Sequence, residues 1–530
     1  MAITLGLVEA IDSNGVYVSM PGSRGVLRGP YKALSTVAAG TTVLVASTDD
    51  GEQLVVGAAP GDMGAVSVLS FGARGDDVSD DTAAVQAAVD AAIASGGVVT
   101  FPPGVYKVTS AITVNGPVTL TGTGTIHQTA SAHGLVITGD GVTVEGLTLT
   151  GRHSGAVSLD VDEDAIRAFG ASAASPLSRL TVRTVTISGW GMYGVNAKWV
   201  DGFAVTGCDI SRIGYAGVLA TSALNGTISG NRISDVGPGS SGNMYGVALS
   251  REETDSLLTD PHCADVVVSN NIVSGIAWEG LDTHGGLRIT FTGNMIRDCY
   301  VGIAVGESDN SSNDGTWAPK DVVVSNNVID SSVDDGSAGY GVTFVGAPGA
   351  TSADPATDYA TGVVSGNVIR GHGTESSSTS GAIYVRNTEG LVVSGNVIER
   401  PSPLAVVAYY DNRGLTCLGN AVTDVWSDTH TDPSAVGLLS DNNTGVMTGN
   451  VLRSGDKSAT YLNVNGIRNG VGSAGGCDVR VGVNSFDATN FTSSYSGVQP
   501  EITGSRGGNA ALSSLLTALE DLGLILDSSS

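Results

Sequence analysis

The sequence predicts an all-β fold: a solenoid of parallel coils over residues 63–506, between a small β-barrel (1–62) and a C-terminal coiled-coil-like helix (507–530). The main observation is a phrase repeated eight times between Ser229 and Leu452, and a Gly-rich, Thr- and Val-rich composition supports it. The copies are SGNRI, SNNIV, TGNMI, SNNVI, SGNVI, SGNVI, LGNAV and TGNVL. A regular repeat interrupted by insertions of variable length is typical of a solenoid.

Composition excludes several classes of protein. The 25 basic and 52 acidic residues give a net charge of −27, which argues against nucleic acid, because phosphates need Lys and Arg. The five cysteines are scattered, so we expect buried free thiols rather than a disulfide framework or a metal cluster. No stretch approaches the ~20 apolar residues of a membrane span, and we expect no membrane insertion. The first residues lack a basic leader and a cleavage site, so we expect synthesis in a cytoplasm.

Residues 1–62 contain short runs of alternating polarity, such as ITLGLVEAI and GVYVSM. Asn14-Gly15 and Asp50-Gly51 are hairpin turn signals between such runs. We therefore expect a small OB-like β-barrel, with a boundary near Pro60-Gly61.

A helix is predicted over residues 79–95. Ser79, Asp80 and Asp81 are candidate N-caps, and Val85, Val89 and Ile93 form an apolar stripe. The first coil of a solenoid would otherwise expose its apolar interior, so we expect this helix to cover that end.

Within the coils, the asparagine at the third position of each copy marks the register. These asparagines are Asn231, Asn271, Asn294, Asn327, Asn367, Asn396, Asn420 and Asn450. Parallel coils stack equivalent positions ~4.8 Å apart, so we expect the asparagines to form a hydrogen-bonded ladder rather than a catalytic set.

At the C-terminus, leucines follow a 3-4-3-4 spacing: Leu512, Leu515, Leu519, Leu522 and Leu526. This spacing is typical of a coiled-coil seam. A helix this short does not hold alone, so we expect it either to join an oligomeric bundle, which we favour, or to cap the last coil.

Three stretches together resemble one known family. FGARGDDVSDDTAAVQAAVDAAIASGGVVTFPPGVYKV is similar to the opening signature of pectate-lyase-like right-handed parallel β-helix proteins (the pectin lyase fold), which include phage tailspikes and polysaccharide hydrolases. The N-terminal β domain and the terminal ALSSLLTALEDLGLI helix resemble parts of minor tail proteins of actinobacteriophages. The fold hosts lyases, hydrolases, epimerases and binding proteins, so it does not fix the reaction.

The resemblance implies a bacteriophage tailspike in the virion tail. Such a protein is a homotrimer that is made in the bacterial host cytoplasm and acts outside the host cell. It attaches to tail or baseplate proteins, here through residues 1–62, and it binds and often cleaves a host cell-surface glycan. No cofactor is expected, apart from a calcium ion that one acidic segment, considered below, leaves open.

The coil SGIAWEGLDTHGG departs most from its neighbours. Strand alternation places Asp282 and His284 on one outward face, with Glu279 in the turn before them. Equivalent positions in adjacent coils are small (Ala248, Ser250, Ala304 and Gly306), which leaves room for a sugar ring. The structural alternative is a solvated surface pair beside a turn residue; three acid/base groups within six positions favour function.

Glycoside hydrolysis needs a general acid and a second carboxylate. Glu279 and Asp282 are the candidate pair, His284 tunes a pKa or binds a hydroxyl, and Glu307 is the reserve carboxylate. The alternatives are a polysaccharide lyase, in which His284 acts with Tyr245 or Arg251, and a receptor-binding spike without catalysis.

Long insertions flank this coil, and long loops in a compact solenoid are often functional. They supply four candidate substrate-binding residues: Tyr245, Arg251, Asp309 and Trp317. Trp317 either stacks on a sugar or packs against its own loop. Tyr384 and Arg386, on later coils, either extend the binding surface or face a neighbouring subunit.

A second acidic cluster lies in SLDVDEDAIRAFG, with Asp160, Asp162, Glu163 and Asp164. A calcium site and a solvated loop are both compatible with this segment. The solvated loop is favoured, because no ligand register like that of an EF-hand is present.

Overall fold

A computed structural model gives the conformation of most of the chain. The described residues are 2–19, 27–33, 42–47, 53–58, 65–95, 97–154, 157–160, 162–237, 243–251, 262–307, 317–331, 339–347, 358–373, 380–402, 404–425, 434–439, 443–453, 465–469, 478–481, 485–487, 501–504, 510–521 and 526–529. They fall into two compact units, Met1–Val218 and Leu219–Ser530. Each unit is described by itself.

The N-terminal strands form the expected small barrel. Five strands close it in the order β1-β2-β3-β5-β4. Their bounds are β1 (Ala2–Asp12), β2 (Gly15–Ser19), β3 (Leu27–Ala33), β4 (Thr42–Ser47) and β5 (Gln53–Ala58). The Asn14-Gly15 turn joins β1 to β2 as predicted, and Val8, Val18, Val43 and Val55 lie in the core. Asp50-Gly51 lies outside the described residues.

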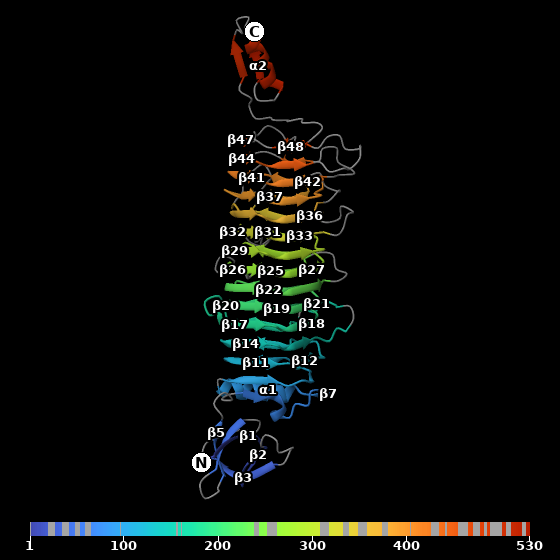
Figure 1. Ribbon diagram of the computed structural model, residues 1–530. Coiled ribbons are helices and arrows are strands. Elements are labelled where there is room, and N and C mark those ends of the chain that lie inside the picture. The colour runs from blue at the N-terminus through green and yellow to red at the C-terminus, as the bar shows by residue number, and fades with distance from the viewer. Residues whose placement is uncertain are drawn as a thin grey trace. The chain divides into compact units, whose positions relative to one another are not determined.

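The rest of the first unit is a stack of coils whose strands form three parallel sheets, numbered 1 to 3 in the order in which each coil visits them (Figure 1). Sheet 1 contains β10 (Ile112–Val114), β13 (Leu135–Ile137), β16 (Ile166–Phe169) and β19 (Tyr193–Lys198). Sheet 2 contains β6 (Ala65–Ser67), β8 (Val98–Phe101), β11 (Val118–Gly122), β14 (Val142–Glu145), β17 (Leu177–Arg183) and β20 (Val200–Thr206). Sheet 3 contains β7 (Asp76–Asp80), β9 (Val105–Val108), β12 (Thr125–Gln128), β15 (Thr148–Thr150), β18 (Thr186–Trp190) and β21 (Asp209–Ile213).

Helix α1 (Thr82–Ser95) covers the first coils, as predicted, and starts slightly later than residue 79 because β7 occupies Asp76–Asp80. Val85, Ala88, Val89 and Ala92 are its buried residues, and the helix packs on β6, β8, β9, β10 and β11. A short 3-10 helix, η1 (Val68–Phe71), lies beside it. The apolar end of this coil stack is therefore closed by α1.

The second unit repeats the same three-sheet coil; strand β22 (Ala216–Thr221) spans the division between the units in sequence. Sheet 1 contains β25 (Tyr245–Ser250), β28 (Glu279–His284), β31 (Val301–Gly306), β34 (Val342–Val345), β37 (Gly381–Arg386), β40 (Leu404–Tyr409), β43 (Ser434–Leu439) and β46 (Asn465–Asn469). Sheet 2 contains β23 (Leu224–Ser229), β26 (Ala264–Ser269), β29 (Leu287–Thr292), β32 (Val322–Ser325), β35 (Gly362–Ser365), β38 (Val392–Ser394), β41 (Leu415–Leu418), β44 (Thr444–Thr448) and β47 (Asp478–Val481). Sheet 3 contains β24 (Arg232–Val236), β27 (Ile272–Ile276), β30 (Met295–Arg297), β33 (Val328–Asp330), β36 (Val368–Arg370), β39 (Val397–Glu399), β42 (Ala421–Thr423), β45 (Val451–Arg453) and β48 (Ser485–Asp487).

The predicted asparagine ladder is confirmed. All eight asparagines of the repeat are buried, and the side-chain amide of each of the first seven donates to Oδ1 of the next asparagine along the ladder, at 2.9–3.0 Å. The backbone N–H of each of these seven also donates to that same oxygen, for example from Asn327 to Asn367 at 3.0 Å. The asparagines therefore fix the turn between sheets 2 and 3 and are part of the scaffold.

The C-terminal helix, α2 (Ala510–Asp521), is shorter than the predicted 507–530 segment. Leu526, the last leucine of the predicted seam, lies instead on β50 (Leu526–Ser529), which pairs in parallel with β49 (Glu501–Gly504). Leu512 and Leu515 are exposed on the helix.

The four described cysteines, Cys208, Cys263, Cys299 and Cys417, are buried free thiols, as expected. Among the described residues, no helix has the length and apolar character needed to cross a membrane.

Candidate active site

The coil that breaks the repeat forms strand β28, and its register with both neighbours is the one expected. Asp282 pairs with Ala248 on β25 and with Ala304 on β31, and His284 pairs with Gly306. Leu281 points into the core between Val247 and Ile303. Small residues therefore flank the two large polar ones on the outer face of sheet 1.

Glu279, Asp282 and His284 form one compact cluster. Nε2 of His284 lies 3.0 Å from Oδ2 of Asp282. One carboxylate oxygen from Glu279, one from Asp282 and one ring nitrogen of His284 lie within 4.8 Å of one another. Oε1 of Glu279 accepts a hydrogen bond of 3.0 Å from the indole Nε1 of Trp278.

The carboxylates of this cluster lack ordinary hydrogen-bond compensation. The Asp282 side chain has no exposed surface, whereas the His284 side chain is 36% exposed. Within the part of the chain that the structure describes, neither oxygen of Asp282 nor Oε2 of Glu279 accepts a hydrogen bond. The 3.0 Å contact with His284 is thus an ion-pair contact without hydrogen-bond alignment. Because a buried unpaired charge is costly, the cluster must hold protons, or bind a ligand, to be stable.

Burial, together with the charge of Asp282, raises the pKa of Glu279 to about 8, so this carboxyl carries a proton at neutral pH. Burial by itself lowers the pKa of His284, but Asp282, Glu279 and a hydrogen bond with the main chain of Glu307 outweigh it and raise this pKa. At neutral pH the cluster therefore contains a neutral carboxylic acid beside an imidazolium–carboxylate pair.

Two other predicted residues lie beside this cluster. Tyr245 pairs with Glu279 across β25 and β28, and its ring meets the His284 ring edge-on at 6.1 Å. Glu307 follows β31 and contributes its main chain to His284. Its side chain is not among the three that form the cluster, and its role as a reserve carboxylate stays a prediction.

Arg251 and Trp317 come together on one side of the site. The guanidinium of Arg251 lies 4.6 Å from the Trp317 ring, and the His262 ring lies 4.0 Å from the same indole. Nδ1 of His262 donates to the carbonyl oxygen of Gly285, next to His284. Arg251 is almost fully buried, whereas Trp317 is only partly buried, and a sugar-stacking role of Trp317 stays a prediction. Asp309 lies outside the described residues.

Tyr384 and Arg386 lie on the same outer face, three strands further along sheet 1. Asp282 pairs with Ala304, Ala304 with Thr343, and Thr343 with Tyr384. The Tyr384 ring lies 5.0 Å from that of Tyr340 and 5.8 Å from that of Tyr409, and the Arg386 guanidinium lies 5.6 Å from the Tyr410 ring. A row of aromatic rings thus follows the small-residue floor beside Asp282.

The donor set of Glu279, Asp282 and His284 could also ligate one metal ion, because imidazole and carboxylate together suit Zn²⁺ or Mn²⁺ better than Ca²⁺. The same three groups are a complete acid/base set once Glu279 is protonated.

Trp278, whose indole stacks on the Tyr300 ring at 4.6 Å, was missed by sequence reasoning, although its position directly before Glu279 was a signal.

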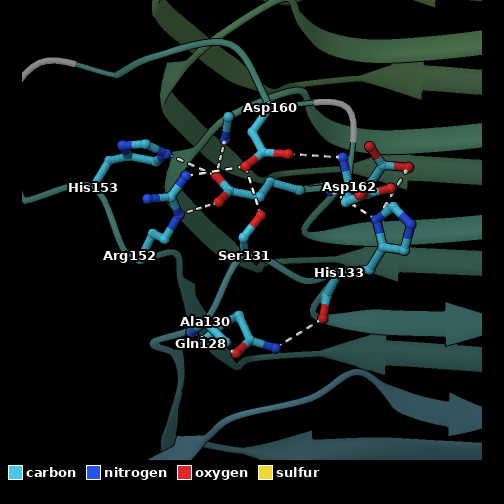
Figure 2. Close-up of polar contacts among 11 residues, drawn as sticks. Gln128, Ala130, Ser131, His133, Arg152, His153, Asp160 and Asp162 are labelled. Atoms are coloured by element: carbon cyan, nitrogen blue, oxygen red, sulfur yellow. Dashed lines mark hydrogen bonds and ion pairs between the residues drawn. The ribbon is translucent and has the colours of Figure 1, made fainter.

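The second acidic cluster is only partly solvated: Asp162 is exposed, and Figure 2 shows Asp160 held by polar contacts. Glu163 and Asp164 are buried. Arg152 bridges Asp160 and Glu163, and Nε2 of His153 lies 2.7 Å from Glu163. Arg152 pairs with both Asp160 and Glu163, and His153 contacts Glu163, so these two carboxylates are already engaged by neighbouring side chains. The neutralising partners come from the preceding segment, outside the repeat register, and the sequence did not reveal them.

The coil architecture defines a class of protein, the right-handed β-helix. Residues 133–352 match the family model for a right-handed β-helix region. The chain is similar in structure to the catalytic unit of a GH87 α-1,3-glucanase from Streptomyces thermodiastaticus, with 16% identity and a TM-score of 0.53, over 92% of this chain and 87% of that one. At such identities the likeness establishes the fold.

Two further likenesses are notable. A tailspike protein of the E. coli bacteriophage HK620, solved in complex with a pentasaccharide, matches with 12% identity and a TM-score of 0.53, over 79% of this chain and 80% of that one. The mannuronan C5-epimerase AlgE6 of Azotobacter vinelandii is 59% identical over 46 residues. That segment is 8% of this chain, and it spans only 5% of the epimerase's length.

Proposed function

We propose that the molecule binds a polysaccharide on the outer face of sheet 1 in the second unit and cleaves it internally at Glu279, Asp282 and His284. The observation that carries this proposal is the buried three-residue cluster between small neighbours, with its acid in the protonated form at neutral pH. Its support from the comparisons is that a glucanase and an oligosaccharide-bound tailspike share the fold.

In this mechanism Glu279 donates its proton to the glycosidic oxygen as the bond to the leaving sugar breaks. Asp282 is the second carboxylate, whose negative charge stabilises the anomeric carbon while a water molecule replaces the leaving sugar there, and His284 balances the charge of Asp282.

Asp282 burial favours a second candidate, β-elimination of a uronate polymer. Because Asp282 has no exposed surface while His284 is 36% exposed, the group that substrate meets first is His284. Asp282 would then hold an imidazolium that neutralises the uronate carboxylate, the neighbouring Tyr245 would be the base, and Glu279 would protonate the leaving oxygen. Both candidates use Glu279 as the proton donor.

The polymer would continue from Asp282 over Ala304 and Thr343 to Tyr384. Adjacent strands lie ~4.8 Å apart, so this path is about 14 Å long, the span of a few sugar rings. Tyr384 and Arg386, with Tyr409 behind them, would form a binding subsite by stacking and hydrogen bonding.

The biological setting is likewise a proposal: a tailspike of an actinobacteriophage virion, attached to tail or baseplate proteins through residues 1–62 and acting on the glycan of a host cell surface. A homotrimer is supported by an apolar stripe on the outside of sheet 3 in the second unit. Seven consecutive strands present one aliphatic residue each, in register: Ile272, Met295, Val328, Val368, Val397, Ala421 and Val451. A stripe that repeats with every coil suits a second copy lying alongside.

The test is to incubate purified protein with a panel of bacterial surface polysaccharides and to separate the products by size. Hydrolysis is expected to release new reducing ends, and elimination is expected to release unsaturated sugars that absorb in the ultraviolet. Glu279→Gln should abolish either product, whereas Glu389→Gln, the same change at an exposed carboxylate, should not. Binding without release of fragments by the wild type would leave a receptor-binding spike and contradict the cleavage proposal.

A further inference from the structure

We infer that the outer face of sheet 1 in the first unit carries a separate binding site, between His133 and Arg167, for the carboxylate group of an acidic sugar. This inference goes beyond the proposed cleavage site and uses none of its residues. It depends on the hydrogen-bond geometry of His133, on one unsatisfied oxygen of Asp164, and on the cations that lie around them.

His133 presents a donor that has no acceptor. The backbone N–H of Asp164 donates to Nδ1 of His133 at 3.1 Å, so this nitrogen carries no proton and a neutral ring must carry its proton on Nε2. Burial, and then the charge of Arg167, lower the pKa of His133, which keeps the ring neutral. Nη1 of Arg167 lies 3.1 Å from that same Nε2. Two N–H donors therefore meet, and an oxygen anion placed beside them would accept from both.

Asp164 supplies the second, independent observation. Its side chain is 1% exposed, and Oδ1 has no hydrogen-bond partner within the described part of the chain. Oδ2 accepts a hydrogen bond of 3.1 Å from Nδ2 of Asn196 and lies 3.8 Å from His133 and 3.9 Å from Arg167. Burial raises the pKa of Asp164 to about 7, so its acid form, which can donate an O–H, is well populated at neutral pH.

The surrounding charge is mixed: Asp162 and Asp160 act electrostatically on His133, and Arg167 and Lys198 are the cations of the site. The Arg167 side chain is 34% exposed, and its guanidinium stacks 4.1 Å from the centre of the Phe169 ring. Nζ of Lys198 lies 5.5 Å from the centre of the same ring. Phe169 and Lys198 are register partners on β16 and β19, and so are Arg167 and Asn196. Two cations thus share one outer face in a chain of net charge −27. A guanidinium held flat on a ring offers its planar fork to a carboxylate.

Asp164 decides between kinds of anion. A carboxylate has a single negative charge and can share the proton of Asp164. A phosphate dianion would be repelled more strongly whenever Asp164 ionises. We therefore assign the site to a uronic acid carboxylate rather than to a phosphate dianion.

The test is calorimetric titration of the full-length protein with four probes: an oligogalacturonate, its carboxyl-reduced neutral counterpart, inorganic phosphate and inorganic sulfate. The oligogalacturonate should bind, and Arg167→Gln should weaken its binding about 10- to 100-fold, the size of a lost charge-assisted hydrogen bond. The matched control is Arg183→Gln, the same change at an exposed arginine of sheet 2 that pairs with Glu145, and it should leave binding unchanged. Arg386→Gln, at the surface proposed to hold the polymer beside the cleavage site, should leave this binding unchanged, which separates the two sites.

Nitrogen NMR of His133 in the wild type gives a readout that needs no variant. We expect the free protein to carry the proton on Nε2 and the Nε2 resonance to shift when the oligogalacturonate is added. A proton on Nδ1, no binding of the acidic probe, or equal binding of the neutral probe would each overturn the site. Equal binding of phosphate or sulfate would overturn its assignment to a sugar carboxylate. If Arg167→Gln does not fold, two measurements still test the site: weaker oligogalacturonate binding by Lys198→Gln, and the titration of the wild type with the four probes.

Discussion

Asp282 has no exposed surface, and its nearest polar neighbour in the cluster is one nitrogen of His284. Such a side chain is expensive for a fold unless something offsets its charge. The neighbouring imidazolium and the proton on Glu279 provide that offset at neutral pH. Burial of these carboxyl groups destabilises the site when they lose their protons. The same burial keeps a proton on Glu279, which can then act as the acid.

Replacing Glu279 with glutamine separates catalysis from stability. Glutamine keeps an acceptor for Trp278 but cannot donate a proton to a glycosidic oxygen. We expect cleavage to fall by about 100- to 10,000-fold, the usual contribution of a general acid. The free energy of unfolding at pH 7 should change by less than about 1 kcal/mol, because a neutral group replaces a neutral group. A variant that still cleaves at the wild-type rate would remove Glu279 from the mechanism.

The stability of the second unit should depend on pH with a definite sign. Glu279 and His284 both have a raised pKa in the fold, so the folded chain binds their protons more tightly than the unfolded chain. Their contribution to stability is therefore present at low pH and is lost as pH rises from the ordinary value of each group toward its raised value. For Glu279 this window runs from 4.5 to about 8.

Denaturant titrations between pH 5 and pH 9 would measure this loss. Glu279→Gln should flatten the profile, and Glu389→Gln should not. Cleavage should decline over the same alkaline limb, as Glu279 loses its proton. A wild-type stability that rises with pH over this range would contradict the assignment.

At the scale of the element, the repeat fixes each turn through two adjacent positions. The first is a residue with positive φ, either glycine (Gly293, φ 66°) or asparagine (Asn326, φ 56°), and the second is the buried ladder asparagine. Glycine and asparagine are the residues that tolerate this left-handed conformation. The sequence alternates between SGN and SNN for this reason.

Removing one asparagine from the ladder should be costly. Asn327 donates to Asn367 and to the carbonyl oxygen of Phe291, and it accepts from Asn294. Asn327→Ala leaves several buried partners unsatisfied at about 1–3 kcal/mol each, so a loss of roughly 3 kcal/mol or more is expected in denaturant unfolding. Asn326→Gly, at the exposed neighbouring position, keeps the backbone conformation and should change stability little.

The elements could be predicted from the sequence where every coil has the same residue types at equivalent positions. The ladder, the inward aliphatic residues and the outward placement of Asp282 and His284 all follow from the register of the repeat. The partners of Glu163 could not be predicted, because Arg152 and His153 come from a segment with no repeat. The covered state of Asp282 was not visible either, since alternation predicts an outward side chain but not what lies over it. The leucine spacing predicted that Leu526 would lie on the C-terminal helix, whereas this residue begins strand β50.

At the scale of the whole molecule, the apolar stripe on sheet 3 predicts how copies associate. The corresponding positions in the first unit are polar, with Thr148, Thr186 and Asp209 in register. The double variant Val328→Lys with Val368→Lys should place two charges per copy in the interface and convert a trimer to monomers in sedimentation. The control, Thr148→Lys with Thr186→Lys, should leave the trimer intact. A monomeric wild type would contradict the homotrimer.

Stacking in single strands also limits how such a molecule can change over evolutionary time. Asp282 and Tyr384 are separated by whole coils, each held by its own ladder asparagine. Duplication or deletion of one coil would preserve the hydrogen bonds of its neighbours and would move the tyrosine by one strand spacing, ~4.8 Å. Selection for longer or shorter glycan segments would therefore proceed in discrete steps, by recombination of repeats, while the residues around Asp282 stay unchanged.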